Sequence, residues 1–232
     1  MLTAAEMAEL ICKGKNIVFL TGAGVSTPSG IPDYRSVSGL YTQSGMKRPE
    51  YLLSRRALLK DTADFHRFIK QLCQTEALPN VIHESMARLE ASKNVTVITQ
   101  NIDGLHSKAG STNVVEFHGT LADCYCESCG VRVTTEAFIE NYTHAGCGGT
   151  VRPDVVLYDE PIDGGNIDRS LAALFTADTI VIVGTSFQVY PFAGLIQYAR
   201  NEARILTVNR DPVDVKADAT FLGDAVAVFE LL

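Results

Sequence analysis

Short apolar runs of strand length alternate with amphipathic stretches along most of the chain. The runs that predict strands lie at 16–20, 95–99, 114–117, 179–183, 205–208 and 225–229. The stretches that predict helices lie at 4–13, 54–61, 62–74, 80–90, 168–176 and 191–201. Such alternation is typical of a parallel sheet that helices cover on both faces. The pattern therefore predicts an α/β fold with a doubly wound parallel sheet of Rossmann type.

Two segments interrupt this alternation. Residues 39–90 have the pattern of several short helices, and residues 123–151 form a module rich in Cys and Gly with little apolar content. We interpret 39–90 as a helical insertion and 123–151 as a small separate module. The Rossmann-type domain is then expected to consist of 1–38, 91–122 and 152–232.

Composition and charge narrow the class of protein. With 46% hydrophobic residues among 232, the chain can bury one core and a small satellite, which excludes a disordered protein. The net charge of -7 argues against a nucleic-acid partner and is compatible with a basic peptide. No apolar run approaches the roughly 20 residues that a bilayer requires. Since Glu6 and Glu9 stand where a secretory signal would be basic, we expect a cytoplasmic protein without a membrane partner. No long apolar stripe demands a dimer, so we expect a monomer.

A glycine-rich turn directly follows the first predicted strand. Gly22, Ala23 and Gly24 would let the backbone approach a pyrophosphate, whose charge free N–H groups can bind. The usual dinucleotide pattern has a third glycine at position 27, where this chain has Thr27. A plain strand-to-helix turn is therefore the alternative.

An aromatic residue lies between two opposite charges shortly after this turn. Asp33, Tyr34 and Arg35 could cover a ligand, with Arg35 on a phosphate, Tyr34 on a ring or ribose, and Asp33 orienting Arg35. The alternative is a surface ion pair.

Polar residues also follow the later predicted strands, at the edge where parallel sheets bind ligands. Asn101 and Asp103 could pair with an amide, although both are also ordinary turn residues. His118 could act as a general base, or could be a hydrogen-bonded structural histidine. Small polar groups that could contact an adenosine ribose or cap a helix are those of Gly184, Thr185, Ser186 and Asn209.

Four residues of the Cys-rich module have the spacing of a metal site. Cys126 and Cys129 form one pair, and His144 and Cys147 form a second pair after fourteen intervening residues. Two such pairs supply the four donors of a tetrahedral zinc site. Cys124 is a competing fourth ligand, and a metal-free cluster is the alternative.

Together these motifs resemble the sirtuins, the NAD-dependent protein deacylases. The stretches that carry the resemblance are 22–35, 99–106, 117–119, the Cys-rich module, 152–156 and 184–186, in the family's order. The resemblance implies that NAD and an acetyl-lysine peptide enter a cleft between a Rossmann-type domain and a small domain with structural zinc. The products would be free lysine, nicotinamide and O-acetyl-ADP-ribose. A mono-ADP-ribosyltransferase or NAD hydrolase on the same scaffold, and a non-catalytic NAD-binding module, are the alternatives.

The resemblance also implies roles for single residues. It assigns the catalytic base to His118, with Asn101 as the second catalytic residue. It assigns the acyl-lysine tunnel to Val156 and Tyr158. The NAD site it implies consists of Gly22, Ala23, Gly24, Thr27, Asp33, Tyr34, Arg35, Gln100, Asn101, Ile102, Asp103, His118, Gly184, Thr185, Ser186 and Asn209.

The chain departs from the family's pattern at several of these places. Tyr34 stands where Phe is commoner, His144 where a zinc Cys is usual, and Asp159 where Gly is frequent. Family members that remove succinyl groups carry Tyr and Arg at positions that align with Ile69 and Leu72. An apolar pair cannot neutralise a succinyl carboxylate, so we expect acetyl or longer apolar acyl groups as substrate.

Overall fold

A six-stranded parallel sheet forms the larger part of the molecule. The computed structural model describes residues 1–32, 49–74 and 76–232. The strand order is β3-β2-β1-β7-β8-β9, and every pairing in this sheet is parallel. The strands are β1 (Asn16–Thr21), β2 (Asn94–Thr99), β3 (Val114–Glu116), β7 (Thr179–Val183), β8 (Arg204–Asn209) and β9 (Ala219–Leu222). This is the Rossmann order, in which the chain first adds strands on one side of β1 and then, from β7, on the other side. Ligands bind at the strand ends beside such a reversal of strand order. The predicted doubly wound sheet is confirmed.

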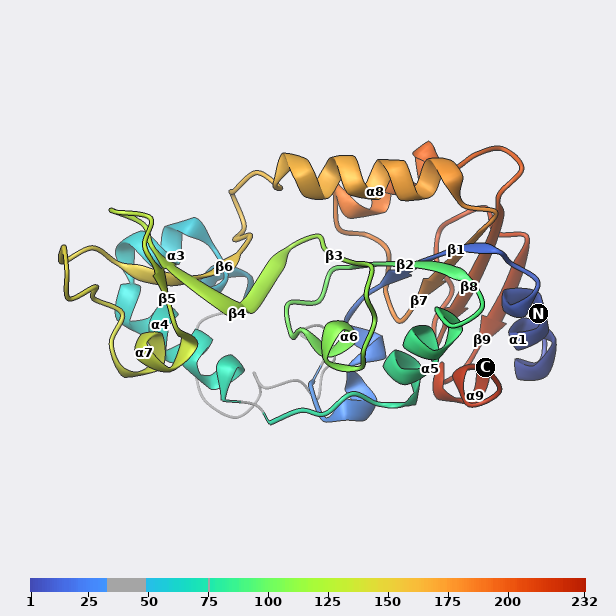
Figure 1. Ribbon diagram of the computed structural model, residues 1–232, viewed down its shortest axis with the longest axis horizontal. Coiled ribbons are helices and arrows are strands. Elements are labelled where there is room, and N and C mark those ends of the chain that lie inside the picture. The colour runs from blue at the N-terminus through green and yellow to red at the C-terminus, as the bar shows by residue number, and fades with distance from the viewer. Residues whose placement is uncertain (33–48, 75) are drawn as a thin grey trace.

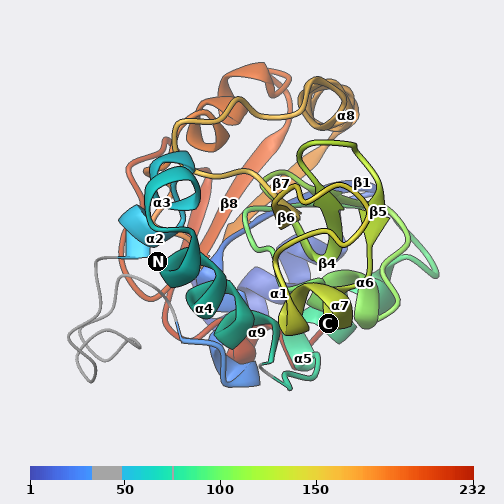
Figure 2. The ribbon, with the colours of Figure 1, turned by 90° about the vertical axis from the view of Figure 1, so that its left-hand side faces the viewer.

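Helices cover both faces of this sheet (Figures 1 and 2). One face packs against helices that contribute Met7, Ile82 and Phe229 to the core, and the other against helices that contribute Leu174 and Phe192. The first set is α1 (Ala4–Cys12), α5 (Val81–Leu89) and α9 (Val226–Phe229), and the second is α8 (Gly164–Thr176) and the 3-10 helix η3 (Phe192–Tyr198). Among the described residues, no helix is both long and apolar enough to pass through a bilayer.

A smaller lobe lies beside the sheet, at the left of Figure 1. Its antiparallel sheet has the order β5-β4-β6, from β4 (Gly119–Cys126), β5 (Arg132–Val133) and β6 (Val151–Val155). Its helices are α2 (Pro49–Leu52), α3 (Arg55–Lys60), α4 (Thr62–Cys73) and α7 (Thr135–Glu140). Phe65, Phe68 and Phe138 are buried together with Val151 in one separate core. The Cys-rich module and helices α2 to α4 therefore fold as one lobe, whereas α5 packs on the large sheet.

The structure differs from the predicted elements at the C-terminal end. The apolar run 225–229 is not a strand but the N-cap and the single turn of helix α9. The ring centroid of Phe229 in this helix lies 5.9 Å from that of Phe19. The last strand is β9, which the apolar pattern missed because all four of its residues are only partly buried. The helix expected at 191–201 is the shorter η3. Helix α6 (Leu105–Lys108), a single turn after β2, was also not predicted.

The chain passes from the large sheet to the small one at a glycine. Gly119 has a φ of 78°, and a Cβ there would lie 2.0 Å from the Asp154 carbonyl oxygen. Only glycine fits this crossing, because a side chain meets both a left-handed backbone and a neighbouring strand.

We expect Gly119→Ala to lower the free energy of unfolding by ~3 kcal/mol or more, since the adjacent strand must move. Gly110→Ala is the matched control, because Gly110 has a φ of 99° with open space around it, and the strained backbone alone costs roughly 1 kcal/mol. Denaturant titration of both variants checks this, and equal losses would contradict the steric argument.

Candidate functional site

A cavity of about 1240 Å³ lies where the strand ends of the large sheet face the small lobe. Residues from both lobes line it, with Gly24, Asn101, His118 and Ser186 on the side of the large sheet and Tyr158 on the other. Its position at the carboxyl ends of β1, β2 and β7 is the one that parallel sheets use for ligands.

The two glycine-rich turns at this edge pack directly against each other. The Gly24 N–H donates to the Gly184 carbonyl oxygen at 2.8 Å. A Cβ at Gly24 would lie 2.7 Å from the Gly184 Cα, and one at Gly22 would lie 2.7 Å from the Thr185 Cβ. The glycines are therefore required by turn-to-turn contact. Two 3-10 helices of three residues, η1 (Ala23–Val25) and η2 (Thr27–Ser29), follow the turn in place of the expected α-helix start.

A hydrogen-bonded chain of side chains organises the end of β2. The Asn101 amide donates to the Ser26 hydroxyl at 3.0 Å and to the Gly22 carbonyl, and Ser26 Oγ donates to Asp103 Oδ2 at 2.7 Å. Asp103 Oδ1 accepts from the Leu105 N–H at 2.9 Å. The structure thus brings Asn101 and Asp103 together through Ser26. Sequence reasoning missed Ser26, although it lies in the same turn as Thr27.

His118 lies at the end of β3 with one ring nitrogen bound within the chain. Its Nδ1 is 3.2 Å from the Gln100 carbonyl oxygen, and a bond in this direction makes Nδ1 the protonated nitrogen. Nε2 is then the nitrogen that can accept a proton. Burial lowers the pKa of His118, against a smaller opposite effect of the Gln100 bond. His118 is therefore a neutral base at neutral pH.

Asn209 holds the second turn in place. Its Oδ1 accepts from the Thr185 N–H at 2.8 Å, and its Nδ2 donates to the Ile182 carbonyl. The side chain is buried, at 6% exposure. Both the oxygen and the nitrogen of the Asn209 side-chain amide thus have partners within the chain. Thr185 and the exposed Ser186 line the cavity nearby.

Residues 155–158, which we call the substrate segment, join the two sides of the cavity. The Val156 N–H donates to the His118 carbonyl oxygen at 2.8 Å. At its other end, the Tyr158 N–H donates to the Leu53 carbonyl at 2.8 Å, and the Arg55 N–H donates back to Tyr158 at 3.0 Å. The segment is therefore fixed between His118 and the start of α3.

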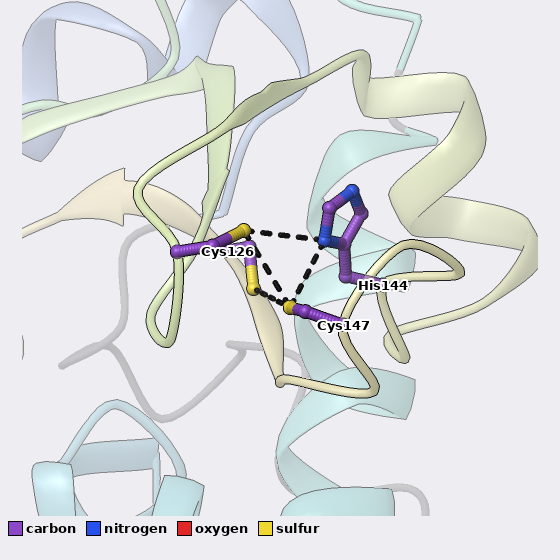
Figure 3. A group of neighbouring side chains, drawn as sticks. Cys126, His144 and Cys147 are labelled. Atoms are coloured by element: carbon purple, nitrogen blue, oxygen red, sulfur yellow. Dashed lines mark hydrogen bonds between the residues drawn. The ribbon is translucent and has the colours of Figure 1, made fainter.

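The four predicted metal ligands lie together in the small lobe (Figure 3). All their donor atoms lie within 4.8 Å of one another. His144 Nδ1 is 3.3 Å from Cys129 Sγ and 3.2 Å from Cys147 Sγ, and Cys126 Sγ is 3.5 Å from Cys147 Sγ. Donors of a tetrahedral zinc ion, at about 2.3 Å from the metal, are roughly 3.7 Å apart, so three thiols and one imidazole fit zinc.

Cys124 is not part of this group. Its Sγ lies 3.9 Å from Thr135 Oγ1, and the side chain is buried in the core of the small lobe. Burial raises the pKa of this thiol, which disfavours the thiolate that a metal needs. For Cys126, burial opposes ionisation, but hydrogen bonds from the Cys129 and Ser128 backbone outweigh it and the pKa is lowered.

The comparisons with known proteins agree with this geometry. The model of the Sir2 family matches residues 22–191. The chain belongs to the Sir2 family. A relative from Listeria monocytogenes serotype 4b, called NAD-dependent protein deacetylase, is 52% identical over 226 residues, covering 97% of this chain and 98% of the relative. One of the same name from Enterococcus faecalis is 46% identical over 221 residues, covering 95% and 92%.

Solved structures of Sir2 proteins have the same fold. A complex of Sir2 with deacetylated p53 peptide and 3'-O-acetyl ADP-ribose has a TM-score of 0.87 at 29% identity, covering 99% of this chain and 97% of that one. A Sir2 homologue with NAD has a TM-score of 0.86 at 33% identity, covering 97% and 91%.

The departures of this Sir2 chain from its family can now be placed. Asp159 has a φ of 72°, a left-handed backbone that explains why glycine is frequent there. Leu72 lines the cavity, whereas Ile69 is fully buried in the core of the small lobe. Of the remaining predicted NAD contacts, Ala23, Thr27, Gln100, Ile102 and Asp103 line the cavity. Asp33, Tyr34 and Arg35 lie outside the described residues.

We expect the purified protein to hold about one zinc ion per chain, by elemental analysis. His144→Ala and Cys147→Ser should release the metal and lower the melting temperature, and Cys126→Ser should also impair folding. Cys124→Ser is the control and should retain the metal. Loss of zinc from Cys124→Ser with retention in His144→Ala would reverse the ligand assignment.

Proposed function

We propose that this Sir2 protein is an NAD-dependent protein-lysine deacetylase that releases nicotinamide and O-acetyl-ADP-ribose. The observation that carries the proposal is the position of His118. Its carbonyl oxygen binds the Val156 N–H of the substrate segment, and its Nδ1 is held by Gln100 at the strand edge. One residue thus connects the side where NAD would lie with the side where the acyl-lysine would enter.

The cavity has features that fit NAD. Ala23, Gly24 and Gly184 of the two packed turns line the cavity, so a pyrophosphate could approach the backbone there. Gln100 Nε2 is a buried donor with no partner among the described residues. Buried donors are nearly always paired, so this one indicates a polar ligand group in the adjoining cavity. Bound NAD would supply the electrophilic ribose carbon to which the acetyl oxygen is transferred.

The side chains of the enzyme then have separate tasks. Ser26 fixes the positions of Asn101 and Asp103, which would hold the nicotinamide end of NAD. Thr185 and Ser186 would contact the adenosine half. Neutral His118 would take a proton from a ribose hydroxyl at Nε2 while Gln100 keeps the ring oriented. Positioning the acetyl oxygen beside the ribose supplies a large part of the rate.

The lining of the cavity supports uncharged acyl groups as substrate. Leu53, Leu72, Val156 and Leu157 contribute apolar surface around the substrate segment. An acetyl or longer apolar acyl group fits such a lining, whereas these apolar side chains offer a succinyl carboxylate no opposite charge.

Further parts of the proposal concern where and how the enzyme works. We propose a monomer in the cytoplasm that acts on acetylated proteins, with neither nucleic acid nor membrane as partner. The net charge of -7 supports the absence of nucleic-acid and membrane partners, because it disfavours binding to anionic surfaces.

We expect the wild-type protein, given NAD and an acetylated peptide, to remove the acetyl group and to release nicotinamide, followed by mass spectrometry. His118→Ala should bind NAD normally and lose about 10²-fold or more in kcat, because the base is missing. A peptide that instead gains ADP-ribose would indicate a mono-ADP-ribosyltransferase. Full turnover in His118→Ala would exclude His118 as the base.

The acid limb of the pH profile should lie lower than for an ordinary histidine. Burial lowers the pKa of His118 below that of an ordinary histidine, so the base keeps its unprotonated form to lower pH. We expect the midpoint of the acid limb of kcat/KM to lie below the ordinary histidine pKa of about 6.5. A decline centred at or above pH 7 would contradict this assignment.

A further inference from the structure

The largest fully buried side chain among the described residues is an arginine. Arg152 in β6 is 2% exposed, and its guanidinium binds both carboxylate oxygens of Glu160, with 2.9 Å between Nη2 and Oε2. It also donates to the carbonyl oxygens of Pro153 and Val155. The pair closes the loop that contains the substrate segment, since β6 precedes this segment and Glu160 follows it.

Two further charges extend this pair to the metal site. Arg55 at the start of α3 binds Glu127, which lies between the metal ligands Cys126 and Cys129. Arg55 Nη1 is also 3.6 Å from Glu160 Oε1, and Arg152 Nη1 is 3.6 Å from Glu127 Oε1. Two arginines and two glutamates therefore alternate in one cluster, which we call the charge quartet.

The quartet binds the backbone of the substrate segment directly. Glu160 Oε2 accepts the Leu157 N–H at 3.0 Å, between the bonds that hold Val156 and Tyr158. Burial opposes ionisation of Glu160, but Arg152 and the Leu157 N–H outweigh it and lower its pKa, so the carboxylate is charged. The quartet thus joins the substrate segment, at Glu160, to the loop of the metal site, at Glu127.

Stability alone does not explain such a cluster. A partly buried ion pair often stabilises a fold no more than apolar residues of similar size, because desolvation offsets the attraction. What bidentate arginine bonds supply is a fixed geometry. The quartet is therefore suited to setting the position of the segment relative to the metal loop.

We propose that Glu127 and Arg55 are positioning residues for the acyl-lysine peptide: through Glu160 and Arg152 they hold the substrate segment in register with the metal loop. This proposal rests on the deacetylase function proposed above. It assigns the loop Cys126–Cys129 a role in peptide binding besides its contribution of metal ligands.

The test compares Glu127→Gln with Asp154→Asn. Asp154 directly precedes the segment and also forms an arginine pair, but its exposed carboxylate binds Arg132 of β5 at 2.8 Å and not the segment or the quartet. We expect Glu127→Gln to raise the KM for acetyl-peptide about tenfold, with the KM for NAD, the zinc content and the melting temperature near wild type. Asp154→Asn should leave all four values unchanged.

Hydrogen exchange of the amides of residues 156–158 gives a readout that does not depend on turnover. Exchange in Glu127→Gln should be several-fold faster than in Asp154→Asn, since the segment opens locally more often. Unchanged exchange together with an unchanged peptide KM would overturn the proposal. An inactive wild type would overturn the deacetylase function, and exchange would still decide the role of the quartet.

A second variant covers a failure of Glu127→Gln to fold. Arg55→Met removes the other partner of the same pair, and its side chain is already 36% exposed. The bond from the Arg55 N–H to the Tyr158 carbonyl oxygen does not depend on the arginine side chain. We expect the same rise in peptide KM and the same faster exchange, and a folded Arg55→Met with neither change would overturn the proposal.

Discussion

The bond between the His118 carbonyl oxygen and the Val156 N–H is the contact on which the site depends. At this point the chain leaves the parallel sheet, Gly119 turns it into the antiparallel sheet, and β6 returns beside it. Gly119 of β4 pairs with Val155 of β6. His118 and Val156 therefore lie side by side and are joined by the backbone bond. A movement of either lobe therefore shifts the His118 imidazole and the substrate segment together.

Polar residues at the strand ends of this protein mainly bind each other. Asn101, Ser26 and Asp103 form one chain of bonds, and Asn209 binds both strand β7 and the turn that follows it. Such internal pairing holds the groups still before a ligand arrives, which reduces the ordering cost of binding. Gln100 is the contrasting case, since its buried side-chain nitrogen lacks a partner in the described part of the chain.

Several parts of this arrangement could be predicted from the sequence, and the reasons for the others are physical. Strands β1 and β7 are buried on both faces, so each is one apolar run, whereas β9 is half-buried and has no such signal. The run at 225–229 looks like a strand because a single helical turn with an apolar face has too few residues to show a period.

The metal site and the quartet show the limits of spacing. Spacing favoured His144 but left Cys124 as a competing fourth ligand, and the pairing of β4 with β5 and β6 turns Cys124 away into the core. Arg152 lies in one of the stretches that carry the family resemblance. Its partner Glu160, and the pair of Arg55 with Glu127, could not be predicted from the local sequence pattern. Arg55 and Glu127 are 72 residues apart in sequence, so only the fold brings them together.

The contact between the two glycine turns also limits how this protein could be redesigned. Gly24 and Gly184 lie so close that neither accepts a methyl group without displacing the opposite main chain. Libraries that randomise these two positions would recover mostly glycine, whatever dinucleotide analogue is selected for. Engineering of altered co-substrate selectivity therefore has to begin at neighbours such as Ala23, which lines the cavity and is not one of the two contacting glycines.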